Sequence, residues 1–166
     1  IIVLVGVVAA VVAAVVLWRA SRRRRLQDWF GPEYDLAVEE AGSRRAAEAE
    51  LVAREKRHDT LDIRPLDPQV RERYADQWAE VQERFVDDPD SAVSEARELV
   101  TAVMGDRGYP TDTDDEQQIA DLSVEHGRTV SQYRDAVSVS ARAEAGEATT
   151  EELRLAMVHY RALFAE

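Results

Sequence analysis

The amino-acid sequence predicts an all-α protein, with a single N-terminal transmembrane helix, a polar stalk helix and then a four- to five-helix bundle. Three observations favour this fold class. Residues 1–17 contain no charged side chain, apolar residues recur at helical spacing through residues 67–166, and no hairpin turn joins two runs of alternating residues. The chain therefore divides into a transmembrane helix (1–18), a basic juxtamembrane segment with charged stalk helices (19–59) and an acidic helical bundle (60–166).

The uncharged run, closed by Trp18, would be about 27 Å long as a helix, close to the ~30 Å hydrocarbon core of a membrane. Five arginines follow within the next seven positions: Arg19, Arg22, Arg23, Arg24 and Arg25. Because such charge stays on the cytoplasmic side, we expect a single-pass protein of the cell (inner) membrane, with its N-terminus outside and its C-terminal domain cytoplasmic. The alternative is a cleavable signal peptide, but its charges precede the apolar run, and it ends at a small-residue cleavage site.

Small residues recur every four positions within the predicted transmembrane helix, at Gly6, Ala10 and Ala14. Residues at this spacing share one helix face and let a second membrane helix approach closely. We interpret this face as a packing surface for another subunit or for a second copy of the chain. The alternative is that a helix rich in valine and alanine has this spacing by chance.

The helix is expected to continue through residues 19–30 and to end at Gly31, because proline follows and disfavours helix in the residue before it. Trp29 and Phe30 lie at the end of this segment. They could face the lipid interface, dock on the protein's own domain or dock on a partner. A short helix, Pro32–Ala41, follows.

Residues 43–58 differ from the rest of the chain because charged side chains occupy most positions, and Leu51 and Val52 are the only large apolar residues. A helix with so little apolar surface is usually exposed to solvent. The segment is expected to be a stalk about 24 Å long. A short coiled coil is the alternative, although no heptad is sustained over three repeats.

Stop and start signals divide the remaining residues into helices. Asp67 with Pro68 and Thr149 with Glu152 are predicted helix starts, the second pair as a capping box. Aromatic residues recur at helical spacing and are expected to form the core, with the lining of a ligand pocket as the alternative: Tyr74, Trp78, Phe85, Tyr133 and Tyr160.

The charge of the bundle restricts its partners. Residues 60–166 contain 24 aspartates and glutamates against 11 arginines, which argues against nucleic-acid binding, because phosphate neutralisation needs a basic surface. The sequence has no cysteine, and its three histidines lack the spacing of metal ligands. No catalytic, cofactor-binding or metal-binding residue is therefore predicted.

Five segments resemble an uncharacterised family of small actinobacterial proteins with an N-terminal hydrophobic segment: Trp29–Tyr34, Leu61–Leu66, Arg84–Pro89, Arg107–Pro110 and Met157–Arg161. The resemblance spans nearly the whole of residues 29–166. It implies that these residues form one evolved unit, and it implies no activity, cofactor or catalytic residue.

These observations lead to two functional hypotheses. The first is a non-enzymatic, single-pass accessory subunit or adaptor of a larger membrane assembly, whose partners are other membrane subunits or a second copy of the chain. Anionic lipid headgroups would contact the five arginines. The alternative is a membrane-tethered helical sensor domain that binds a small ligand or lipid in a cavity lined by the aromatic residues.

The predicted topology can be tested with reporter fusions after Glu166. A reporter that is active only outside the membrane is expected to give no signal, because the arginines retain the C-terminal side in the cytoplasm. A reporter active only in the cytoplasm is the matched control and should be active. The opposite pair of results would contradict the topology.

Overall fold

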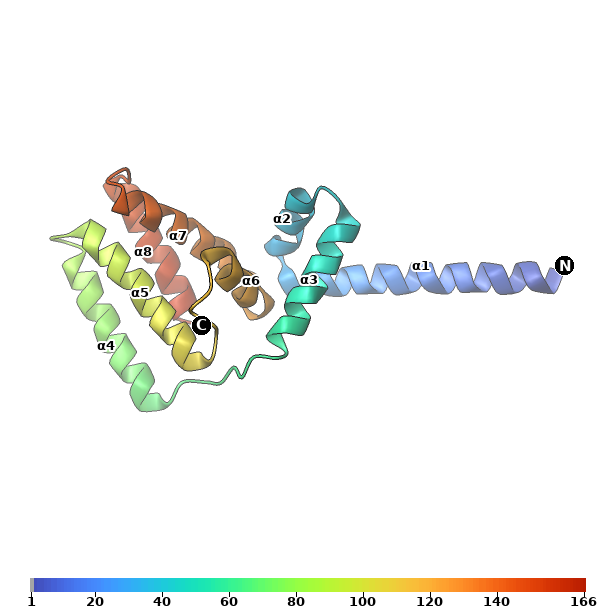
Figure 1. Ribbon diagram of the computed structural model, residues 1–166, viewed down its shortest axis with the longest axis horizontal. Helices are drawn as coiled ribbons and strands as arrows, with labels where there is room; N and C mark the ends of the chain where they lie inside the picture. The colour runs from blue at the N-terminus through green and yellow to red at the C-terminus, as the bar shows by residue number, and fades with distance from the viewer. Residues whose placement is uncertain (1) are drawn as a thin grey trace.

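The computed structural model describes the backbone of residues 2–166 and the side chains of residues 12–166, and every regular element in that range is an α-helix. The prediction of an all-α protein is confirmed. Figure 1 shows the first helix projecting as a long rod from the remaining helices, with the N-terminus at its far end. In chain order the helices are α1 (Ile2–Phe30), α2 (Pro32–Ala41), α3 (Arg44–His58), α4 (Pro68–Arg84), α5 (Pro89–Arg107), α6 (Asp115–Glu125), α7 (Val130–Glu144) and α8 (Thr150–Phe164).

Helix α1 continues without interruption from the apolar run through the arginines, as predicted, and its 29 residues correspond to about 43 Å. It ends where Gly31 adopts a φ of 53°, a left-handed conformation that glycine tolerates best. The predicted transmembrane helix, residues 1–18, includes Ile1 and ten side chains that lie outside the described residues. Within the described part of the chain, no helix meets the length and hydropathy expected of a membrane span.

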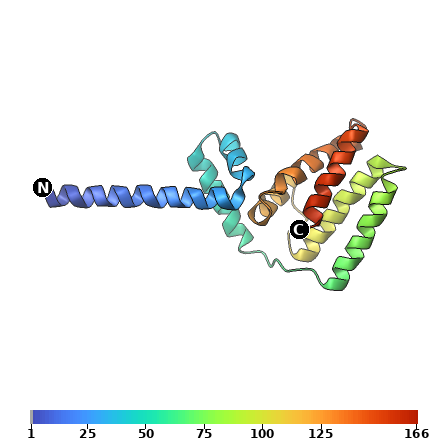
Figure 2. The ribbon, with the colours of Figure 1, turned by 180° about the vertical axis from the view of Figure 1, so that it is seen from behind.

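The predicted bundle is present as α4, α5, α7 and α8, which share one apolar core together with part of α6. Figure 2 shows the same group of helices from behind, on the side of the molecule away from the rod. The indole ring of Trp78 stacks on Phe164 with ring centroids 4.9 Å apart. Tyr133 meets the edge of Tyr160 at 5.9 Å. The prediction that Trp78, Tyr133 and Tyr160 belong to the core is confirmed, since all three are buried.

A second, smaller apolar cluster lies where α1 meets α2 and α3; residues 26–58 are called the N-terminal lobe below. Its buried residues are Leu26, Phe30, Tyr34, Ala37, Ala47 and Leu51, joined by Val124 of α6. The prediction that residues 43–58 form a solvated stalk is therefore wrong for one face of α3. Ala47 and Leu51 lie one turn apart, and both are fully buried because α2 folds back on α3 while α6 contacts the same face.

Residues 59–67 link the lobe to the bundle and are not helical. In space, this link lies beside the C-terminal end of α5. The Arg64 amide donates a hydrogen bond to the Arg107 carbonyl at 2.9 Å. A Cβ at Gly108 would lie 2.2 Å from the Asp62 carbonyl oxygen, so only glycine permits this approach. The helix starts at Asp67 and Thr149 are confirmed, the second as a complete capping box with Glu152.

Substitution of Trp78 tests the core. Trp78→Ala should lower the free energy of unfolding by about 3–5 kcal/mol, because it removes a buried aromatic side chain and its contact with Phe164. Trp78→Phe should cost less, since it also removes an indole N–H that is buried without a partner in the described part of the chain. Thermal denaturation of the full chain in detergent measures both.

Val86→Ala is the control for this series, because Val86 is 83% exposed and its loss should leave the melting temperature unchanged. A melting temperature for Trp78→Ala equal to that of Val86→Ala would show that Trp78 does not contribute to a packed core.

Candidate functional site

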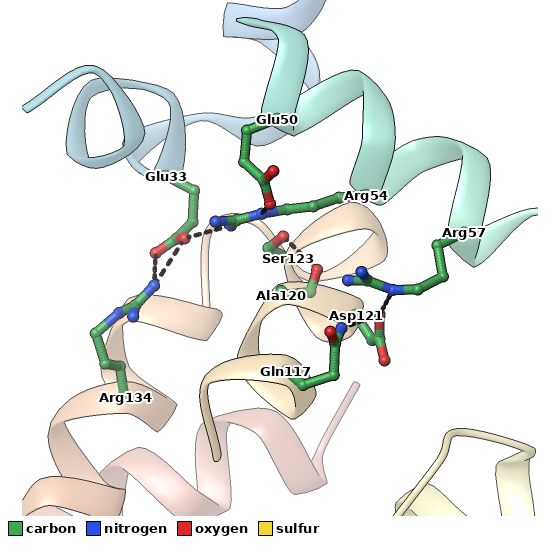
Figure 3. Close-up of polar contacts among 9 residues, drawn as sticks. All are labelled: Glu33, Glu50, Arg54, Arg57, Gln117, Ala120, Asp121, Ser123 and Arg134. Atoms are coloured by element: carbon green, nitrogen blue, oxygen red, sulfur yellow. Dashed lines mark hydrogen bonds and ion pairs between the residues drawn. The ribbon is translucent and has the colours of Figure 1, made fainter. Parts of the chain in front are cut away.

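The N-terminal lobe is attached to the bundle by polar contacts that are buried between α2 and α3 on one side and α6 and α7 on the other. Two carboxylates lie at the centre of this joint, Glu33 of α2 and Asp121 of α6, and each residue is only 1% exposed. Figure 3 shows that arginines from other helices point at both of them. A buried carboxylate without such partners would be strongly unfavourable, so loss of any one of these arginines should be costly.

Glu33 is bound by arginines from two helices. Arg134 of α7 donates through Nη2 to both carboxylate oxygens, at 3.0 and 3.3 Å. Arg54 of α3 places its Nη1 3.7 Å from the same carboxylate and also donates from Nε to Glu50 at 3.3 Å. The Glu33 side chain therefore links α2 to both α3 and α7.

Asp121 makes the second connection, between α3 and α6. Arg57 donates from Nε to its carboxylate at 2.7 Å, and Gln117 donates from its side-chain amide at 3.0 Å. Two guanidinium nitrogens of the joint, Arg57 Nη2 and Arg134 Nε, are buried without a partner in the part of the chain that the structure describes. Because desolvation of these groups offsets much of the Coulombic attraction, the paired joint adds little net stability, whereas loss of one partner leaves a buried charge uncompensated.

The backbone at the end of α1 also contacts the bundle closely. A Cβ at Gly127 would lie 2.7 Å from the Phe30 carbonyl oxygen, so the turn between α6 and α7 accepts α1 only because glycine is there. Next to it, the Trp29 indole donates to the Val124 carbonyl at 2.6 Å. The end of α1 is thus held in place from two sides.

A further polar group lies where α3, α5 and α6 end, around Glu125. The Tyr109 hydroxyl donates to the Glu125 carboxylate at 2.9 Å, Arg107 lies 3.4 Å from it and His58 Nε2 lies 3.6 Å from it. Burial raises the pKa of Tyr109, and its hydrogen bond to Glu125 acts in the same direction, so the phenol stays protonated. His126 adds a fourth side chain at 3.9 Å.

These polar groups bind one another, and each buried carboxylate is paired within the chain. The carboxylates of Glu33 and Asp121 are each directed at guanidinium groups of the chain itself. Among the described residues, no group of histidine and acidic side chains has the arrangement needed for a metal ion. The joint links the N-terminal lobe, from which α1 projects, to the helices of the bundle.

The arginines predicted to bind lipid lie on α1 before the joint, and they differ in their surroundings. Arg22 lies over the ring of Trp18, 5.5 Å from its centroid, and Arg25 pairs with Glu55 of α3. Arg23 faces Tyr34, whose pKa is raised by burial and by its hydrogen bond to a carboxylate of α3. Arg19 and Arg24 are exposed.

The other predicted site residues fall into three groups. The side chains of Gly6 and Ala10 lie outside the described residues, while Ala14 is exposed on α1. Phe30 is fully buried in the chain's own cluster with residues of α2, α3 and α6, which corresponds to the alternative that it docks on the protein's own domain and leaves no surface of Phe30 for a partner. Trp29 remains 54% exposed.

The residues of the joint were not identifiable from the sequence. Glu33 stands in the first turn of α2, where acidic residues are common for their interaction with the helix dipole. Asp121 lies in a helix whose residues 118–124 are all buried, which leaves no polar face to mark it. Only the packing of α2 and α3 against α6 and α7 buries these carboxylates and places arginines beside them.

Searches against protein-family models, curated proteins and solved structures each found no match to this chain. The resemblance to a family of actinobacterial proteins therefore stays a prediction.

Removing one partner of the joint should be costly. Arg134→Met leaves Glu33 buried with only the longer contact to Arg54, and should lower the free energy of unfolding by about 3–5 kcal/mol. The double variant with Glu33→Leu removes the buried charge as well and should recover part of this loss. Amide hydrogen exchange across α2 and α3 shows whether the lobe detaches first.

Arg154→Gln is the matched control, since Arg154 pairs with Glu151 on the exposed surface of α8. An exposed pair of this kind contributes at most about 1 kcal/mol. If Arg154→Gln and Arg134→Met lower the free energy of unfolding equally, the buried ion pair of the joint stabilises the fold no more than a surface ion pair does.

Proposed function

We propose that this chain is a single-pass membrane accessory subunit or adaptor, in which α1 is held in the bilayer of the cell (inner) membrane and the acidic bundle lies on the cytoplasmic side. The observation that carries the proposal is the joint. It connects the N-terminal lobe, from which the exposed apolar part of α1 projects, to an acidic bundle through buried ion pairs, which oppose a change in the relative direction of the two parts.

The exposed apolar surface of α1 supports the membrane part of the proposal. Val12, Val15, Val16, Leu17 and Trp18 are all between 42% and 70% exposed. A contiguous apolar surface of this kind is unfavourable in water and favourable in hydrocarbon. The aromatic ring of Trp18, followed at once by arginines, has the order of groups found at a membrane interface.

The packing of the bundle supports an adaptor over the alternative, a sensor that holds a ligand in an aromatic cavity. Trp78 stacks on Phe164, and Tyr133 and Tyr160 contact each other within the core. The Tyr160 hydroxyl also shares a 2.7 Å hydrogen bond with Ser140, which satisfies both buried groups internally. Trp78, Tyr133 and Tyr160, three of the five aromatic residues that would line such a cavity, are therefore engaged in contacts within the core.

A rigid attachment has a direct use in an adaptor. If the membrane helix binds another subunit, the joint transmits that orientation to the bundle, whose acidic surface can then face a second partner. We expect the contact within the membrane to use the small face of Gly6, Ala10 and Ala14, where close backbone approach compensates for the lack of a hydrophobic driving force between helices in lipid.

The test is co-purification from native membranes in mild detergent. Gly6→Leu combined with Ala10→Leu keeps the helix apolar enough to insert but fills the small face, so the variant should reach the membrane and lose its partner, whether another protein or a second copy. Val8→Leu with Val12→Leu is the matched control on the opposite face and should retain the partner. Association that survives the first pair of substitutions would contradict a role for this face.

A further inference from the structure

A groove between α1 and α3, called the arginine groove below, is the strongest unassigned feature of the described part of the chain. It has a volume of about 580 Å³, within the range of small-molecule sites, and its basic wall consists of Arg19, Arg22, Arg23, Arg44 and Arg45. Trp18 closes it on the side of the apolar part of α1. The first three arginines come from α1 and the last two from the start of α3.

The charge of the groove is not neutralised by the chain itself. None of these five arginines has a carboxylate within 4 Å among the described residues, whereas Arg25, Arg54 and Arg57 each do. Glu48 is the acidic residue in the lining; its carboxylate accepts a 2.9 Å hydrogen bond from the Tyr34 hydroxyl and offsets one of the five positive charges. The groove therefore keeps a net positive charge, and its guanidinium groups can bind an anion from outside the chain.

We propose that the arginine groove binds the phosphodiester headgroup of an anionic phospholipid. Guanidinium groups match phosphate oxygens through paired hydrogen bonds, and clusters of several arginines beside a membrane helix recognise anionic lipid. Exposed apolar side chains continue from the groove along the same face of α1, so an acyl chain can lie along Val12, Val15 and Val16 while the phosphate lies among the arginines. A free phosphate would contact the arginines but not the apolar side chains of α1.

This inference rests on the proposed function, because it requires α1 to lie in a bilayer, and it adds residues that the arginine block of α1 does not contain. Arg44 and Arg45 are brought to α1 by the fold of α2 against α3. Their positions at the start of α3, where the helix dipole is positive and no acidic side chain stands in the first turn, favour an anion further. The net negative charge of residues 60–166 disfavours a lipid contact elsewhere on the bundle.

The experiment measures lipid binding to the full chain in a non-ionic detergent, by isothermal titration with short-chain, soluble lipids. Dihexanoyl phosphatidylglycerol should bind, and dihexanoyl phosphatidylcholine, with the same acyl chains but no net charge, should bind at least tenfold more weakly. Arg44→Gln with Arg45→Gln should weaken phosphatidylglycerol binding by about 10- to 30-fold, as expected for the loss of two charges near an anionic headgroup.

Arg71→Gln with Arg161→Gln is the matched control, because both residues are exposed on the bundle and the change in net charge is the same. This control should leave the affinity within twofold of the wild type. Far-ultraviolet circular dichroism checks that each variant is folded, and the exposed positions of Arg44 and Arg45 favour that outcome.

Three results would overturn the proposal: equal affinities for the two lipids, no loss of affinity in Arg44→Gln with Arg45→Gln, or tighter binding of either inorganic phosphate or a poly-glutamate peptide than of phosphatidylglycerol. Phosphate would indicate a free-anion site and the peptide a protein-binding site. Since the Arg44 and Arg45 variant keeps all of α1, co-purification with the membrane partner should be unchanged, so failure of the lipid proposal is distinguishable from failure of the adaptor proposal.

Discussion

The carboxylate of Glu33, buried between Arg134 and Arg54, is the interaction on which the arrangement of the molecule depends. It joins α2, α3 and α7 at one point, and Asp121 with Arg57 repeats the same device between α6 and α3. If the lobe moved away from the bundle, these charges would lose partners that a low-dielectric site makes indispensable. An apolar contact alone would tolerate sliding, since its energy depends on area and little on direction. The ion pairs favour the orientation in which both carboxylates are paired.

That orientation matters because α1 is long. A rotation of 10° at the joint would move the far end of a rod of about 43 Å by roughly 7–8 Å. The contacts around Phe30 and Trp29 reduce this freedom further, because Gly127 allows the end of α1 to touch the turn between α6 and α7, and the indole is hydrogen-bonded to Val124. These contacts are the basis for the proposal that the chain is an adaptor that presents its bundle in a set direction.

Charge is separated along the same axis. The arginine groove lies where α1 passes α3, and the negative charge is concentrated in residues 60–166. Near an anionic membrane surface the first would be attracted and the second repelled, each over a distance of about a Debye length, ~8–10 Å. The proposed lipid contact and the proposed position of the bundle away from the surface therefore follow from one distribution of charge, and both act through the joint that holds α1, α3 and the bundle together.

The local features of this protein were determined by the sequence itself. The apolar run, the break at Gly31, the caps at Asp67 and Thr149 and the aromatic stripe through Trp78 depend on neighbours within a few positions, and short-range patterns describe such features well. The tertiary structure alone decided which face of α3 is buried, where Phe30 packs, that Glu33 and Asp121 are paired with arginines, and that Arg44 and Arg45 lie beside the arginines of α1. Each of these depends on side chains that are up to 101 positions apart in sequence. A charged residue on a short helix has the same local pattern whether solvent or an arginine from another helix lies opposite, and only the packing of the helices distinguishes the two.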